Sequence, residues 1–142
     1  MPSWKNSIVI QAPPDRVFAY VSDPSNFPEW IPSMVEIRDV IGTGAGQQYE
    51  WTYKMAGILL HGEGVVVEHV PQERSVHQNI GMIEAHVAFS VEPHEEGAAL
   101  TLGVDYGIPI PVLGRLAERI VTRRNEREFQ LALDNAKELF EA

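Results

Sequence analysis

The segment after Pro111 carries the longest regular pattern in this 142-residue chain. It contains no proline, and its apolar side chains recur at the three- and four-residue spacing of one helix face. The pattern predicts one long amphipathic helix that runs to the carboxyl terminus, either continuous or interrupted near Arg123 and Arg124. A helix of this kind must lay its apolar face on another element. The apolar residues are Leu113, Leu116, Ile120, Val121, Leu131, Leu133, Ala136, Leu139 and Phe140.

Shorter elements precede this helix, and proline marks their boundaries. Residues 7–12 are rich in β-branched side chains and stop at Pro13, as expected of a strand. Apolar residues at 17, 18 and 21 then predict a helix that begins at Pro14 and ends before Ser22. Prolines at 24, 28 and 32 leave room for only a single-turn helix between them. The first elements are therefore one strand and two short helices.

Six strand-like segments follow the short helices. Their apolar residues alternate with a period of two, and turns containing glycine or proline separate them. The second segment is the most regular, because Tyr49, Trp51, Tyr53 and Met55 alternate with polar residues. One face of this strand is expected to be buried and aromatic. The segments cover residues 34–40, 48–55, 58–70, 76–82, 84–92 and 98–106.

The pattern of the third segment, residues 58–70, does not decide which of its two faces points inward. In one phase its odd-numbered residues point inward, and His61 and Glu63 stand near Tyr53. In the other phase its even-numbered residues point inward, and both polar groups face water. Both sets contain apolar residues, and Gly62 or Gly64 could mark a bulge, so parity does not choose between them. In the first phase His61, Glu63 and Tyr53 are the candidates for proton transfer.

The order of these elements predicts an α+β fold. Consecutive antiparallel strands flanked by helices give a sheet with its helices on one face. The terminal helix is the one element large enough to cover that face. A curved sheet that grips it leaves a space wherever large side chains do not fill the gap, and this space is a candidate ligand cavity. The length, with 44% hydrophobic residues, fits a single domain over residues 1–142.

Four stretches of the chain carry a further signal: IQAPPDRVFAYVSDPSNFPEWIP, VVEHVPQER, FSVEPHEEGAALTL and the carboxyl-terminal helix. Together they resemble the START-like (SRPBCC) superfamily, which has the helix-grip fold. This group includes the Bet v 1 allergens, polyketide cyclases/dehydrases, and coenzyme Q-binding and lipid-transport proteins. The resemblance implies a curved antiparallel sheet of about seven strands around the long helix, with two short helices after the first strand. It also implies that Phe18, Phe27 and Trp30 either help to close one end of the cavity or form ordinary core.

Composition and charge argue against several classes of function. Twenty acidic and eleven basic residues give a net charge of -9, which repels phosphate backbones, so nucleic acid is not an expected partner. There is no cysteine, and the five histidines lack metal-ligand spacing, so we expect neither a metal nor a cofactor. Without an apolar run of ~20 residues or a signal-peptide pattern, we expect a cytoplasmic protein that does not insert into membranes.

These observations predict a protein that binds or carries a hydrophobic or aromatic small molecule, such as a lipid, a polyketide or a quinone-like compound. The loop from Gly107 to Pro111 is a candidate gate. The alternative is a polyketide cyclase or aromatase-type enzyme, the activity that the resemblance implies, with His61, Glu63 and Tyr53 as catalytic candidates. The predicted ligand-binding residues are Tyr49, Trp51, Tyr53, Met55, Phe89, Leu102, Val104, Tyr106, Leu113, Leu116, Ile120, Phe129, Phe27 and Trp30.

Overall fold

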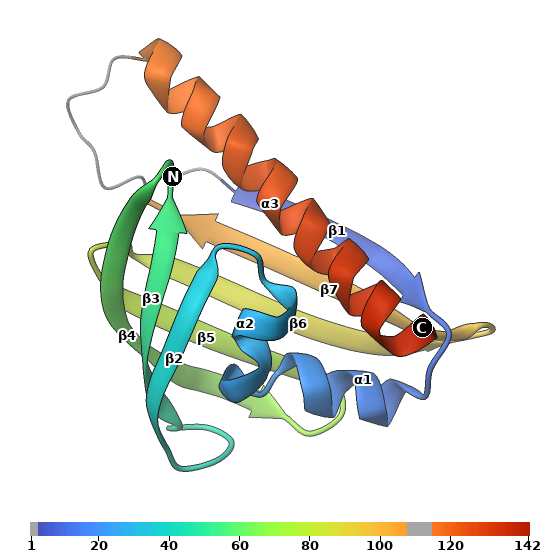
Figure 1. The fold of residues 1–142 in the computed structure, drawn as a ribbon. Helices are drawn as coiled ribbons and strands as arrows, with labels where there is room; N and C mark the ends of the chain where they lie inside the picture. The colour runs from blue at the N-terminus through green and yellow to red at the C-terminus, as the bar shows by residue number, and fades with distance from the viewer. Residues whose placement is uncertain (1–2, 108–114) are drawn as a thin grey trace.

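A curved antiparallel sheet holds one long helix against its inner face in the computed structural model (Figure 1). The structure describes residues 3–107 and 115–142. It confirms the predicted α+β helix-grip fold. In chain order the elements are β1 (Ser3–Ile10), α1 (Pro14–Val21), the 3-10 helix η1 (Pro24–Asn26), α2 (Phe27–Trp30), β2 (Met34–Ile41), β3 (Gln48–Met55), β4 (Ile58–Val70), β5 (Arg74–Gly81), β6 (Ala85–His94), β7 (Gly97–Tyr106) and α3 (Arg115–Glu141).

The strands follow one another in space except at β1. The order across the sheet is β1-β7-β6-β5-β4-β3-β2, and every neighbouring pair is antiparallel. Five hairpin connections therefore link β2 to β7, whereas α1, η1 and α2 carry the chain from one edge of the sheet to the other. In the β1–β7 pair, Ile10 lies opposite Ala98 and Ser3 lies opposite Asp105.

Proline and aspartate determine where the short helices begin. Pro14 occupies the first turn of α1, where its missing N–H leaves no hydrogen bond unmade. The Asp23 side chain accepts a hydrogen bond from the Ser25 backbone N–H at 3.0 Å, which caps η1. α2 is a single turn, as the spacing of the prolines predicts. Its carbonyl at Trp30 accepts a hydrogen bond from Asn135 Nδ2 of α3 at 3.1 Å.

α3 is continuous from Arg115 to Glu141, so the helix has no interruption near Arg123 and Arg124. Among the predicted apolar residues of this helix, Ile120, Leu131 and Leu139 are exposed. Ile120 and Leu131 each precede a buried residue, and one step along a helix turns the side chain by roughly 100°, which points these two side chains toward solvent. Among residues 119–141 of α3, the buried side chains recur at helical spacing and are Val121, Asn125, Ala132, Leu133 and Ala136.

Hydrogen bonds fasten the carboxyl-terminal end of α3 to the first strand. The Lys137 ammonium donates to the Val9 carbonyl oxygen at 2.7 Å and to Glu141 Oε2 at 2.7 Å. The same Glu141 oxygen accepts the Gln11 backbone N–H at 2.9 Å. These contacts hold α3 across the sheet at the end where α1 packs (Figure 1).

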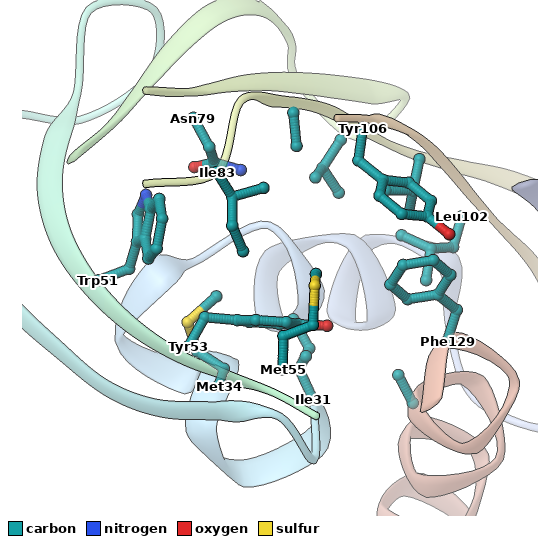
Figure 2. Close-up of a pocket in the computed structure, with 14 residues that line it drawn as sticks. Ile31, Met34, Trp51, Tyr53, Met55, Asn79, Ile83, Leu102, Tyr106 and Phe129 are labelled. Carbon is teal, nitrogen blue, oxygen red and sulfur yellow. The ribbon is translucent and has the colours of Figure 1, made fainter. Parts of the chain in front are cut away.

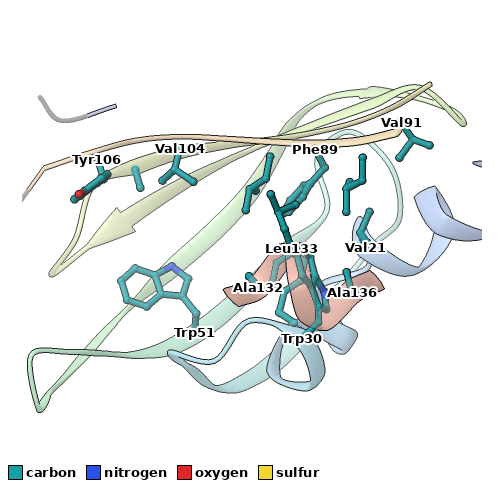
Figure 3. Packing of buried hydrophobic residues seen from close by; sticks show 14 of the residues in the cluster. Val21, Trp30, Trp51, Phe89, Val91, Val104, Tyr106, Ala132, Leu133 and Ala136 are labelled. Carbon is teal, nitrogen blue, oxygen red and sulfur yellow. The ribbon is translucent and has the colours of Figure 1, made fainter. Parts of the chain in front are cut away.

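The core is closely filled where the short helices meet the sheet (Figure 3). The Phe27 ring packs against Trp30, Tyr49, His77 and Phe89, with ring centroids 5.6 to 6.4 Å away. Leu133 and Ala136 of α3 close this region and are fully buried. Phe18, Phe27 and Trp30 therefore lie in the ordinary core, which is the second of the two alternatives that the sequence left open.

Candidate ligand-binding site

An apolar cavity lies between the sheet and α3, toward the ends of β3 and β7 that are farthest from α1 (Figure 2). Aromatic, methionine and aliphatic side chains form nearly all of its wall. The residues come from the segment after α2, from five strands or their connections, and from α3. They are Ile31, Met34, Trp51, Tyr53, Met55, Asn79, Ile83, Ala85, Val87, Leu102, Val104, Tyr106, Phe129 and Ala132.

Two glycines on β4 make room for aromatic rings of β3, one in this wall and one in the core beside it. Gly62 lies opposite Trp51 in the β3–β4 pair, and Gly64 lies opposite Tyr49. A Cβ atom at Gly62 would overlap the Trp51 indole, and one at Gly64 would overlap the Tyr49 ring. The two rings therefore occupy space over β4 that a side chain at position 62 or 64 would otherwise fill. Glycine at these two positions brings the aromatic rings of β3 close to the sheet.

The same pairing settles which face of β4 points inward. Leu60, Gly64 and Val66 are buried, and His61 and Glu63 are exposed on the outer face. The His61 ring lies beside Thr52, with Nδ1 3.0 Å from Thr52 Oγ1. The phase in which His61 and Glu63 face the cavity is therefore wrong, and neither can act there. Tyr53, the third candidate for proton transfer, lines the cavity.

The cavity is small for a drug-sized ligand. About 90 Å³ of it is open to the centres of water molecules, several times the ~10–15 Å³ that a single water requires. Pockets that enclose drug-sized ligands measure ~300–1,000 Å³. The space as it stands suits a small aromatic group. A larger ligand requires the wall to move, and the unbranched side chains of Met34 and Met55 are suited to this.

The lining residues in the described part of the chain carry no charge at neutral pH. Burial raises the pKa of Tyr53 to about 12, although Ser33 acts in the opposite direction. Burial also raises the pKa of Tyr106. Both phenols keep their protons at neutral pH, so they can donate hydrogen bonds but cannot serve as bases. Trp51 Nε1 is shielded from solvent and has no hydrogen-bond partner among residues 3–107 and 115–142. The Tyr106 hydroxyl is shielded as well, with the side chains of Asn125 and Thr122 near it.

A chain of polar side chains stands behind the cavity, within the core. His77 of β5 is buried, with Nε2 3.0 Å from Ser75 Oγ and Nδ1 2.9 Å from Tyr49 Oη. The Tyr49 hydroxyl lies 3.4 Å from Oδ1 of Asn79, a residue that lines the cavity. Burial lowers the pKa of His77 to about 4, and His69 acts in the same direction. The imidazole is therefore neutral at physiological pH.

The structure brings half of the predicted ligand-binding residues to the cavity. Trp51, Tyr53, Met55, Leu102, Val104, Tyr106 and Phe129 line it. The others have different positions. Tyr49, Phe89, Phe27 and Trp30 are buried in the core beside it, and Ile120 is exposed. Leu113 and the side chain of Leu116 lie outside the described residues, as does most of the candidate gate from Gly107 to Pro111.

Sequence reasoning missed seven lining residues. Ile83, Ala85 and Val87 follow from the inward phase of β6, because Phe89 and Val91 of the same strand are buried. Asn79 shares the inward face of β5 with Ser75 and His77, a polar face that alternation alone would assign to solvent. The remaining three, Ile31, Met34 and Ala132, depend on how α2 and α3 cross the sheet.

The fold and the cavity together define a helix-grip protein with an apolar interior site. The sequence profile described as polyketide cyclase / dehydrase and lipid transport matches residues 1–141. The chain therefore belongs to this family. A search of curated protein sequences finds no significant match. None of the helices within residues 3–107 and 115–142 has both the length and the hydropathy of a membrane-spanning segment. Within the same residues, no group of three His, Cys, Asp or Glu side chains could hold a metal ion.

Solved structures of similar fold extend over nearly the whole chain. TTHA0849 from Thermus thermophilus has a TM-score of 0.81 at 20% identity, with 96% of this chain and 95% of that chain covered. The Zhui aromatase/cyclase from Streptomyces sp. R1128 has a TM-score of 0.73 at 14% identity, with 95% and 93% covered. The di-domain ARO/CYC StfQ of the steffimycin biosynthetic pathway has a TM-score of 0.77 at 19% identity, with 98% and 50% covered.

Proposed function

We propose that this chain, as one helix-grip domain, binds and carries a hydrophobic or aromatic small molecule between its sheet and α3. The observation that carries the proposal is the apolar, uncharged wall of the cavity, formed by residues such as Trp51, Met55 and Phe129. Membership of a family described by polyketide and lipid chemistry supports the same class of ligand. This class of ligand includes lipids, polyketides and quinone-like compounds.

The energetics of burial are sufficient for such binding. An aromatic ring system that loses about 200 Å² of accessible surface gains roughly 5 kcal/mol at about 25 cal/mol per Å². This corresponds to dissociation constants between millimolar and micromolar for a single ring, and to tighter binding for fused rings. Aromatic contacts with Trp51 and Phe129 would add to the gain.

The second candidate is a cyclase or aromatase-type reaction in the same cavity. The resemblance of the fold to two aromatase/cyclases favours it. The protonated hydroxyl of Tyr53 could donate to a substrate carbonyl. However, no carboxylate or imidazole is among the described lining residues, so the cavity offers no obvious proton acceptor. We therefore place carriage ahead of catalysis.

Native mass spectrometry of the purified protein tests the proposal most directly. We expect a retained organic molecule, or, after its extraction, an increase in the fluorescence of an apolar naphthalene probe on binding. A protein that retains no organic molecule and leaves the probe unchanged would contradict the proposal. A second assay tests the enzyme alternative by incubating the protein with a linear β-polyketone that can cyclise to an aromatic product. Formation of the cyclised product faster than in a protein-free control would favour an enzyme.

A further inference from the structure

The buried polar side chains behind Asn79 form a hydrogen-bonded chain that ends at the cavity. Ser75 Oγ contacts His77 Nε2 at 3.0 Å, and His77 Nδ1 contacts Tyr49 Oη at 2.9 Å. Tyr49 Oη contacts Asn79 Oδ1 at 3.4 Å. Ser75, His77 and Tyr49 are each at most 3% exposed. Bulk solvent does not reach these groups, so they depend on the hydrogen bonds that they make to one another.

A neutral imidazole has one donor and one acceptor nitrogen, so the hydrogens can be arranged in two directions. In the first, Ser75 donates to Nε2, Nδ1–H donates to Tyr49, and the Tyr49 hydroxyl donates to Asn79 Oδ1. Every hydrogen then has an acceptor. In the second, Nε2–H donates to Ser75 and Tyr49 donates to Nδ1.

The second direction leaves a buried hydrogen unpaired. The Ser75 hydroxyl hydrogen then has no acceptor within the described residues, and Asn79 Oδ1 loses the donor that Tyr49 supplied. An unpaired buried donor costs more than an ordinary hydrogen bond gains. The first direction is therefore the favoured one.

We propose that this hydrogen-bonded chain of side chains orients Asn79. Tyr49 holds the Oδ1 atom of Asn79, so that the Nδ2 hydrogens of Asn79 are available to the cavity as donors. The ligand then carries an acceptor oxygen of carbonyl or quinone type at this position. The inference rests on the proposed function, because it names the chemistry of the ligand bound there. Figure 2 shows Asn79 beside Trp51 and Ile83 at the cavity wall.

Asn79 is the specificity-determining residue in this arrangement, and Tyr49 and His77 are positioning residues. Neither of the two needs to touch the ligand. The described lining residues include no acidic or basic group, so the amide faces no competing charge. A purely hydrocarbon ligand would leave the amide hydrogens unpaired, and a ketone of the same shape would pair them.

A matched pair of probes tests the assignment. 2-Acetylnaphthalene and 2-ethylnaphthalene have nearly the same shape, and the first adds a carbonyl oxygen. We expect the preference for the acetyl compound, measured as the ratio of the two dissociation constants, to fall about fivefold in Asn79→Leu. Tyr49→Phe should lower the ratio in the same direction, because the amide is no longer held. Gln78→Leu, a change of the neighbouring residue on β5 whose side chain faces away, should leave it unchanged.

Two spectroscopic measurements separate orientation from general loss of structure. The infrared carbonyl stretch of bound, ¹³C-labelled 2-acetylnaphthalene should lie at lower wavenumber in the wild-type protein than in Asn79→Leu. In the ligand-free wild-type protein, ¹⁵N NMR of His77 should show a proton on Nδ1 and none on Nε2. The NMR measurement needs no variant, so it stays decisive if Tyr49→Phe fails to fold.

The outcomes distinguish this inference from the carrier proposal. If both probes bind and their ratio is the same in wild type and Asn79→Leu, the inference is overturned and the carrier proposal stands. A His77 proton on Nε2 overturns it as well. If neither probe binds, the carrier proposal fails and the inference fails with it.

Discussion

The indole of Trp51 lies across Gly62, the residue directly opposite it on β4. The ring occupies the place where a side chain at position 62 would stand, and it forms one wall of the cavity from there. Tyr49 and Gly64 repeat the arrangement two residues earlier on β3. The shape of the cavity therefore depends on residues without side chains as much as on the aromatic rings.

Gly62→Ala should destabilise the protein, because its methyl group would displace the Trp51 ring and also approach the Ile80 carbonyl oxygen. Overpacking of this kind costs about 1–3 kcal/mol. Gly103→Ala on β7 is the matched control, since its Cβ would meet only Ala88 Cβ, at 4.0 Å. The control should be neutral or slightly stabilising. Urea denaturation of both variants measures the difference, and equal free energies of unfolding would contradict the proposed packing.

Ala85→Leu should weaken binding of an apolar naphthalene probe by about tenfold or more, because the added carbons fill the cavity. Ala88→Leu places the same change on the opposite face of β6, where it adjoins Gly103 across the strand pair. This control should bind the probe as the wild type does. Fluorescence titration gives both affinities. An equal loss in the two variants would indicate a general effect on stability rather than occupation of the cavity.

Stability should fall in acid because of His77. Its pKa is about 4 in the folded protein, below the ordinary value of about 6.5 in the unfolded chain. The unfolded chain therefore binds more protons between these pH values. The free energy of unfolding should drop as the pH falls from about 6.5 toward about 4, by about 3 kcal/mol from this residue.

Denaturation between pH 7.5 and pH 4.5, compared with His77→Gln, isolates this contribution from that of the carboxylates. The difference between wild type and variant should shrink as the pH falls. His86→Gln, which alters an exposed histidine on β6, should retain the wild-type dependence. A His77→Gln variant with the wild-type slope would show that His77 does not cause it.

Lys137→Met should loosen the carboxyl-terminal turn of α3. The variant loses the hydrogen bond to the Val9 carbonyl and the ion pair with Glu141, both at 2.7 Å. The side chain is partly exposed, so we expect a loss of only about 1 kcal/mol. Hydrogen exchange of amides at the end of α3 should quicken while exchange in β6 and β7 changes little. Lys54→Met, on the outer face of β3, should leave exchange in α3 unaltered.

The order of elements could be predicted from sequence because proline, glycine and alternation act locally. Pro14 begins α1, and the prolines at 24, 28 and 32 confine α2 to one turn. β3 and β4 have the predicted bounds. β2 is less regular, since register shifts interrupt its pairing with β3 and Asp39 has a positive φ of 52°. The position of such a bulge depends on the pairing with the neighbouring strand, so the pattern of a single strand does not predict it.

The cavity was harder to predict, because its residues are selected by tertiary packing. The inward phase of β4 follows from the fit of Trp51 over Gly62, a contact between strands that no single-strand pattern contains. The same holds for Phe27 and Trp30, which fill the core because α2 and α3 meet there. His77 is buried, although histidines in such positions are usually solvated. Its role follows from its contacts with Ser75 and Tyr49, which the sequence pattern does not contain.

The pairing of β1 with β7 also affects how the molecule is made. Ile10 pairs with Ala98, and Ser3 pairs with Asp105. This strand pair can therefore form only after the last strand has been synthesised. Contacts between such distant positions close late and slow the folding reaction. Until β7 has been synthesised, β1 therefore lacks the one strand that it pairs with.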